Sequence, residues 1–306
     1  MNVILQEDDM IRIKKILVPV DFSEPSEQAV NYGLSLCLEF KARLVLTHIA
    51  PYDELTYLTA KASLLELIPS GCREEVDYEI IVKSGDVRHE LLGIVQDLAI
   101  DLVIMGSRGR SYFERMLLGS VTERMLRKLH IPILTVSHLA SGKELHSPGH
   151  IPLRKLLFAT DLTDGSEAGL EFSIRLARGL DAHLTVVHVL QAMDAALLGL
   201  EGVGVVPDYV NEVRVQAAER LNKLVALVSD GSVPVTTVVA EGVPCDAILE
   251  LTADQKADLV IINLHEKGRM ERALLGATAE RVIRTAPVPV LSLPLPATYL
   301  SHWAAA

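Results

Sequence analysis

The stretch Lys15-Ile16-Leu17-Val18-Pro19-Val20-Asp21 returns later in the chain as Lys155-Leu156-Leu157-Phe158-Ala159-Thr160-Asp161, 140 residues further on. A second stretch, Asp101-Leu102-Val103-Ile104, returns as Asp258-Leu259-Val260-Ile261, now 157 residues further on. The chain therefore contains two copies of one unit, and the difference between the two spacings means that the second copy carries 17 extra residues.

Short apolar runs alternate with longer amphipathic ones inside each copy. The short runs are rich in Val, Ile and Leu without a clean period of two, which is typical of strands buried on both faces of a sheet. In the first copy we expect strands over 15–20, 43–49, 76–82, 101–105 and 132–136 and helices over 25–40, 86–98 and 119–129, with Ser23 as the first N-cap. Such a series forms a parallel sheet with helices on both faces, so the chain is predicted to be an α/β protein.

The two copies predict two domains joined by a linker. A chain of 306 residues is comfortable for two domains of about 150 residues. We place the first domain over 1–140, the linker over 141–152, the second domain over 153–294 and a C-terminal tail over 295–306. The extra residues of the second copy fall between its second and third strands and include the apolar segment 195–206.

Charge and composition exclude several classes of protein. The net charge is −11, whereas nonspecific nucleic-acid binding needs a basic surface. The apolar segment 195–206 contains Glu201 and is too short to span a membrane. Three cysteines without a CxxC spacing argue against a disulfide framework, and the acidic start of the chain is unlike a signal peptide. We therefore expect a cytoplasmic protein that binds neither nucleic acid nor membrane.

A glycine signature follows the fourth expected strand. Gly106 and Gly109 form a G-x-x-G, and after nine more residues Gly119-Ser120 opens the next expected helix. Glycine lets the backbone approach phosphate oxygens, and a helix start offers free N–H groups and the positive end of the helix dipole. Asp21 ends the first strand, at the sheet edge where parallel α/β folds bind ligands. With Arg108 on the loop to pair with phosphate, the sequence predicts a site for a phosphorylated ligand.

These residues resemble the universal stress proteins in their tandem two-domain form. The resemblance covers nearly the whole chain and is carried by 16–23, by His48-Ile49 and by the glycine signature with the run 117–123. It implies two tandem Rossmann-like domains, each a five-stranded parallel sheet, related by pseudo-two-fold symmetry. It also implies an ATP site, with Mg²⁺, in the N-terminal domain. By resemblance, adenine is surrounded by Pro19, Asp21 and Ile49, and ribose and phosphates are held by Gly106, Gly109, Gly119 and Ser120, with a backbone contact from Val121.

The second copy departs from this pattern. Gly106 is replaced by Asn263, Gly109 by Glu266, Ser120 by Ala277 and Pro19 by Ala159, while Gly276 and Asp161 are kept. A glutamate in place of a glycine adds a side chain and a charge of the same sign as phosphate. We therefore predict that the second copy does not bind ATP in the family's manner.

Two other functions stay open. One is a hydrolase or metal-dependent enzyme in the divergent pocket of the second copy, built from Asp161, His188, His265 and Glu266. The other is an interaction scaffold in which the glycine loop is only structural. His48 and its counterpart His188 are predicted to be structural, because the second stands in the copy that has lost the signature.

The leading hypothesis is a stress-response regulator or sensor that binds an adenine nucleotide and acts on an unidentified protein partner. At most slow hydrolysis is expected, and no catalytic residue is assigned, because no base or arginine finger for phosphoryl transfer is recognised. Single-domain relatives dimerise about their last strand. The strands 132–136 and 288–292 are therefore expected to pair within one chain, which gives a monomeric pseudo-dimer or a homodimer of such chains.

Overall fold

The computed structural model describes residues 11–50, 54–107, 118–139, 151–163, 165–191, 207–264 and 275–294. In the first half, strands and helices alternate in the order β1 (Lys15–Pro19), α1 (Glu24–Phe40), β2 (Arg43–Ala50), α2 (Glu54–Glu66), α3 (Cys72–Glu75), β3 (Tyr78–Ser84), α4 (Val87–Leu98), β4 (Leu102–Gly106), α5 (Ser120–Lys128) and β5 (Ile133–Val136). Every strand and helix expected from the sequence is present, with ends shifted by two residues or fewer.

The second half repeats the series. Its elements are β6 (Lys155–Ala159), α6 (Ser166–Gly179), β7 (His183–Leu190), α8 (Pro207–Val228), β8 (Val235–Glu241), α9 (Pro244–Asp254), β9 (Leu259–Asn263), α10 (Ala277–Thr285) and β10 (Val290–Leu293). The segment 195–206, the C-terminal tail 295–306 and residues 141–150 of the predicted linker 141–152 lie outside the described residues.

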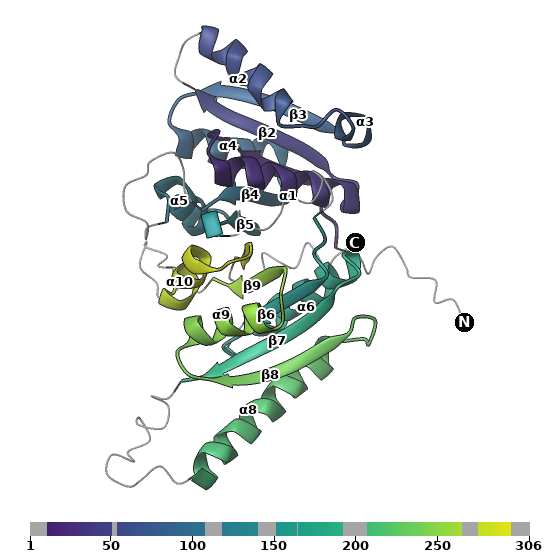
Figure 1. Cartoon of the computed structure of the whole chain (residues 1–306), viewed down its shortest axis with the longest axis vertical. Coiled ribbons are helices and arrows are strands. Elements are labelled where there is room, and N and C mark those ends of the chain that lie inside the picture. The colour runs from purple at the N-terminus through teal and green to yellow at the C-terminus, as the bar shows by residue number, and fades with distance from the viewer. Residues whose placement is uncertain are drawn as a thin grey trace, which may run out of the picture.

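The strands join into a single sheet with the order β3-β2-β1-β4-β5-β10-β9-β6-β7-β8. Neighbouring strands are parallel within each half, and the two halves meet where β5 and β10 pair antiparallel. Figure 1 shows this sheet running from β3 near the top to β8 near the bottom, with the first half above the second. The strand order reads the same from either end, which is the pseudo-two-fold relation of the halves. The predicted pairing of the last strands is confirmed.

Two apolar layers cover the sheet, one on each face. The first contains side chains of α1, α2, α6 and α8, and the second contains side chains of α4, α5, α9 and α10. Both layers run through the two halves without a break. The inner strands are therefore buried on both faces, which explains their largely apolar sequence, whereas β3 and β8 at the two edges of the sheet are only partly buried. The same arrangement buries Leu134 and Leu291, which are partners in the antiparallel pair at the seam.

The two halves use the same local devices. Asp101 Oδ2 accepts hydrogen bonds from the backbone N–H groups of Lys14 and Lys15, both at 2.8 Å, and so joins the start of β4 to the start of β1. Asp258 does the same in the second half for Arg154 and Lys155, at 3.0 Å each. The residues with left-handed backbone also repeat, among them Phe22 and Leu162, which both have φ 58° and lie three residues beyond the ends of β1 and β6.

The segment between the second and third strands of each half contains helices that the sequence pattern does not predict. These are α2 and α3 in the first half and α8 in the second. The apolar residues of α2 are spread around the helix and do not form one stripe, so the helical period is weak there. These helices are stabilised by packing, since Ala60 and Leu64 of α2 and Leu221 of α8 are buried against the sheet.

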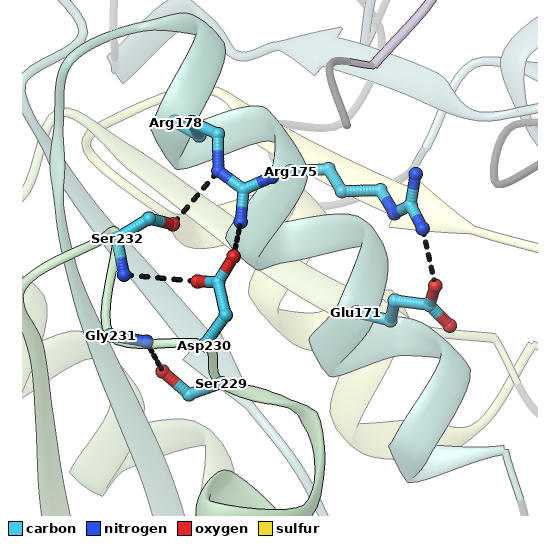
Figure 2. A network of polar contacts seen from close by, with 7 residues as sticks. All are labelled: Glu171, Arg175, Arg178, Ser229, Asp230, Gly231 and Ser232. Atoms are coloured by element: carbon cyan, nitrogen blue, oxygen red, sulfur yellow. Dashed lines mark hydrogen bonds and ion pairs between the residues drawn. The ribbon is translucent and has the colours of Figure 1, made fainter. Parts of the chain in front are cut away.

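A polar network ties α6 to the turn between α8 and β8 (Figure 2). Arg178 Nη2 forms an ion pair with Asp230 Oδ2 at 2.6 Å, and Arg178 Nε donates to Ser232 Oγ at 2.9 Å. Asp230 Oδ1 also accepts from the Ser232 N–H at 2.9 Å. Hydrogen bonds from Ser232 and the charge of Arg178 hold the pKa of Asp230 below its usual range. One helical turn away on α6, Glu171 pairs with Arg175.

All three cysteines, Cys37, Cys72 and Cys245, are free and buried. Burial raises the pKa of the Cys37 thiol. Among the helices in the described part of the chain, none is both long and apolar enough to cross a membrane.

Candidate functional site

A cavity of about 210 Å³ lies at the carboxyl ends of the first half's strands. It forms between the ends of β1, β2 and β4, the helix α4 and the starts of α1 and α5. Its wall consists of Pro19, Val20, Asp21, Ser26, Thr47, His48, Ile49, Val87, Leu91, Met105, Gly106, Gly119, Ser120, Val121 and Thr122. β1 is flanked by β2 on one side and β4 on the other, so the cavity sits where the strand order reverses.

Seven of the nine predicted site residues lie in this wall: Pro19, Asp21, Ile49, Gly106, Gly119, Ser120 and Val121. Arg108 and Gly109 lie outside the described residues. The fold therefore gathers residues that are up to about a hundred positions apart in sequence. They come from the carboxyl ends of three neighbouring strands, β1, β2 and β4, and from the start of α5.

Asp21 organises the turn between β1 and α1. Its Oδ1 accepts hydrogen bonds from the Ser23 N–H at 3.1 Å and from Ser23 Oγ at 2.5 Å. The Ser23 N–H also donates to Ser26 Oγ at 3.1 Å, as expected for an N-cap position followed by a polar side chain in the first turn. Between them, Phe22 takes the left-handed conformation and reverses the chain. The carboxylate of Asp21 is thus held at the cavity wall by its own turn.

His48 holds the end of β1. Its Nδ1 lies 2.7 Å from the carbonyl oxygen of Val20, and its ring packs on Phe22 with centroids 4.9 Å apart. In the second half, His188 Nδ1 lies 2.9 Å from the carbonyl oxygen of Thr160. Since Nδ1 must donate to a carbonyl, both imidazoles share one tautomer and one structural task. These contacts agree with the structural role predicted for the two histidines.

The start of α5 faces the cavity with free N–H groups. The first intrahelical bond runs from Glu123 N to Gly119 O at 2.8 Å, so the N–H groups of Ser120 and Val121 precede the helical ladder. The Gly119 N–H donates to Ser107 O at 2.9 Å, and Thr122 Oγ1 donates to Gly106 O at 2.8 Å. These two bonds tie the helix start to the end of β4. The helix dipole makes this end of the cavity favourable for an anion.

The remaining wall is largely apolar. Pro19, Ile49, Leu91 and Met105 contribute hydrocarbon or thioether surface from three strands and α4. One end of the cavity therefore suits a flat apolar ring, and the other end, at α5, suits a charged oxygen group. Among the described residues of the wall, Asp21 carries a carboxyl group and His48 an imidazole.

A model of the universal stress protein family matches this chain twice, over residues 12–137 and 152–294. The chain belongs to the universal stress protein family. Both matched segments contain one five-stranded half, so the protein is a tandem member.

Related proteins and structures agree with this assignment. Universal stress protein MJ0531 of Methanocaldococcus jannaschii is 31% identical over 144 residues, which cover 47% of this chain and 83% of that protein. Universal stress protein Rv2005c of Mycobacterium tuberculosis is 28% identical over 294 residues, which cover 90% of this chain and 95% of that protein. The crystal structure of a universal stress protein from Archaeoglobus fulgidus shares the fold with a TM-score of 0.66 at 22% identity, covering 92% of this chain and 99% of that one.

The second universal stress domain differs where its counterpart of Gly106 stands. Asn263, at the end of β9, is buried and turns its side chain toward α6, where Nδ2 donates to Gly165 O at 3.4 Å. An ideal Cβ placed on Gly169 of α6 would lie 2.3 Å from Asn263 Oδ1. The asparagine is thus accommodated by a missing side chain on the helix.

The other replacements in the second domain are of two kinds. Ala159 and Ala277 lie at the end of β6 and the start of α10, in the places of Pro19 and Ser120. His265 and Glu266 lie outside the described residues. Within the part of the chain that the structure describes, no group of three or more His, Cys, Asp or Glu side chains could hold a metal ion.

Several wall residues were not identified from the sequence. Val87 and Leu91 are one turn apart on α4, and Met105 precedes Gly106 on β4. The sequence predicts ordinary core positions for them, because an apolar residue type does not show whether the side chain lines a cavity or packs in a filled core. Thr47 was missed for another reason. Its place in the wall follows from its register with Pro19 on β1.

Proposed function

We propose that this universal stress protein is a stress-response regulator that binds one ATP, with Mg²⁺, in its N-terminal domain. The observation that carries the proposal is the cavity at the ends of β1, β2 and β4, whose wall includes seven residues of the family's nucleotide pattern. In this proposal the domains span 1–140 and 153–294, and the protein acts in the cytoplasm on a protein partner.

The two ends of the cavity support the orientation of the ligand. The N–H groups of Ser120 and Val121 suit the phosphates, because they precede the helical ladder and lie at the positive end of the dipole. Pro19 and Ile49 line the apolar end and suit adenine. Mg²⁺ would accompany the phosphates, since it is usually bound in such sites through phosphate oxygens and water.

The asymmetry between the halves supports one site per chain. The second domain has Ala277 in place of Ser120 and Ala159 in place of Pro19. We infer that this domain serves mainly as the partner that covers the β5 edge through β10. Binding of ATP in the first domain would then change the surface around its loops, and hydrolysis would be slow at most.

The test begins with the purified full chain. Heat denaturation should release adenine nucleotide that chromatography identifies, and calorimetric titration with ATP and Mg²⁺ should give one site per chain. A hundredfold excess of ATP over Kd should stabilise the protein by about 2.7 kcal/mol, visible as a rise in Tm. Absence of released nucleotide together with an unchanged Tm would contradict the proposal and favour a scaffold without nucleotide. Turnover that Asp161→Ala abolishes would favour the hydrolase.

A further inference from the structure

Thr47 is a buried polar residue in the wall of the cavity that the nucleotide pattern does not include. It lies on β2, is 1% exposed and contributes to the cavity wall. Its Oγ1 is buried and has no hydrogen-bond partner. A buried hydroxyl without a partner destabilises the fold, because it has lost its bonds to water and gained none in return, so a free hydroxyl at this place calls for a reason.

The register of the sheet places this hydroxyl beside the apolar end of the cavity. Thr47 pairs with Pro19 of β1 in the parallel ladder, and paired residues point to the same face. Ile49, two residues further along β2, lies on that face as well. Pro19 and Ile49 are the residues that line the apolar end, so the Thr47 side chain belongs to the floor on which a base would lie.

The second domain shows what the same position looks like without the hydroxyl. There Ala159 pairs with Val187, which stands in the place of Thr47. Valine has nearly the shape of threonine and lacks only the polar atom. The domain that has lost the nucleotide pattern therefore also lacks the hydroxyl, while the fold of the strand is kept.

We propose that the Thr47 hydroxyl forms a hydrogen bond with the base of the nucleotide bound in the first domain, and so helps to select that base. The inference rests on the proposed function, because it names a contact to the ligand of that same site. A threonine hydroxyl both donates and accepts, so it can pair with a ring nitrogen or with an exocyclic amino group of a purine. The bond would satisfy in the complex a group that is unpaired in the free protein.

The experiment compares the wild-type chain with Thr47→Val and Thr47→Ser by calorimetric titration with ATP and with AMP. Thr47→Val removes one neutral hydrogen bond and should therefore raise the Kd for ATP about five- to tenfold. The Kd of Thr47→Ser should stay within about twofold of the wild-type value. The factor should be the same for AMP, because the contact is to the base and not to the outer phosphates. Thr185→Val, a buried strand threonine of the second domain, is the matched control and should bind ATP as wild type does.

The melting temperature without ligand separates a binding contact from a structural one. Thr47→Val should melt at the wild-type temperature or above, since it removes an unpaired buried group. A lower Tm without ligand would assign the hydroxyl to the fold and overturn the inference. Equal ATP affinity of Thr47→Val and wild type would overturn it too, as would a loss seen with ATP but not with AMP. Failure of the wild-type chain to bind ATP would overturn the proposed function itself.

Discussion

The side chain of Asn263 on β9 occupies the space in which a side chain at Gly169 of α6 would lie. A Cβ on Gly169 would lie 2.3 Å from Asn263 Oδ1 and 2.9 Å from its Cγ. The counterparts in the first domain are Ala29 on α1 and Gly106 on β4, so there the helix carries the side chain and the strand does not. The loss of the glycine in the second domain is therefore coupled to a compensating change on the neighbouring helix.

Gly169→Ala should destabilise the protein, and Asn263→Gly should rescue it. The methyl group collides with a buried amide, which costs about 1–3 kcal/mol, and the better helix propensity of alanine returns up to about 1 kcal/mol. The double variant recreates the pair found in the first domain and should return to within about 0.5 kcal/mol of wild type. Urea unfolding of the four proteins completes the cycle. Additive effects of the two changes would contradict the coupling.

Leu134→Ala should weaken the seam between the two halves. Leu134 of β5 pairs with Leu291 of β10, and both are buried, at 1% and 3% exposure. Truncation of a buried leucine costs about 2–5 kcal/mol, so the midpoint of urea unfolding should fall clearly. Leu227→Ala on α8 is the control, since Leu227 is 68% exposed and should change the stability little. A seam variant as stable as this control would show that the stability of the two halves does not depend on the seam.

Gly109→Glu should abolish ATP binding while Tm without ligand stays at the wild-type value. The change copies Glu266 of the second domain and places a negative side chain in the loop predicted to approach phosphate. Ser120→Ala, which copies Ala277, should weaken binding about tenfold or less, because it removes one hydroxyl and leaves the N–H groups of α5 in place. Calorimetric titration measures both. Wild-type affinity in the Gly109→Glu variant would show that the glycine signature is not the phosphate site.

Tyr32→Phe should reduce the fall in the free energy of unfolding that wild type shows at high pH. Burial, and to a lesser degree the charge of Asp258, raises the pKa of Tyr32 from 10.0 to about 12. The unfolded chain releases the phenol proton near pH 10, but the folded chain keeps it until about pH 12. The contribution of Tyr32 is therefore complete below pH 10 and is lost as the pH rises from 10 to about 12, by roughly 2 kcal/mol.

The measurement is urea unfolding of wild type and Tyr32→Phe at pH 9 and at pH 11.5. Other groups titrate in this range in both proteins, so the difference between the two pH dependences isolates the phenol. Wild type should lose more stability than the variant between the two pH values. Parallel losses would mean that Tyr32 ionises as readily in the folded chain as in the unfolded one.

The elements that could be predicted from the sequence are those whose residues follow a clear local pattern. Apolar runs such as 15–20 and 101–105 predict buried strands because a strand covered on both faces must be apolar throughout. The helix α2 could not be predicted, because its apolar residues do not gather on one side of the helix. Its Leu64 is buried only through contacts with the sheet. The glycines Gly106, Gly109 and Gly119 could be assigned to a phosphate site from the sequence, because their spacing after a strand and before a helix is typical of a backbone that approaches phosphate oxygens.

The sequence by itself determined the duplication, the α/β class and the residues that favour a phosphate, because these follow from spacing, period and residue type. The tertiary structure decided the rest. It joined two sheets into one through β5 and β10, it turned Asn263 toward Gly169, and it set Thr47 beside Pro19 in the cavity wall. Each of these depends on which residues from distant segments share a face or an edge. That is a property of register and packing, and no single stretch of sequence carries it.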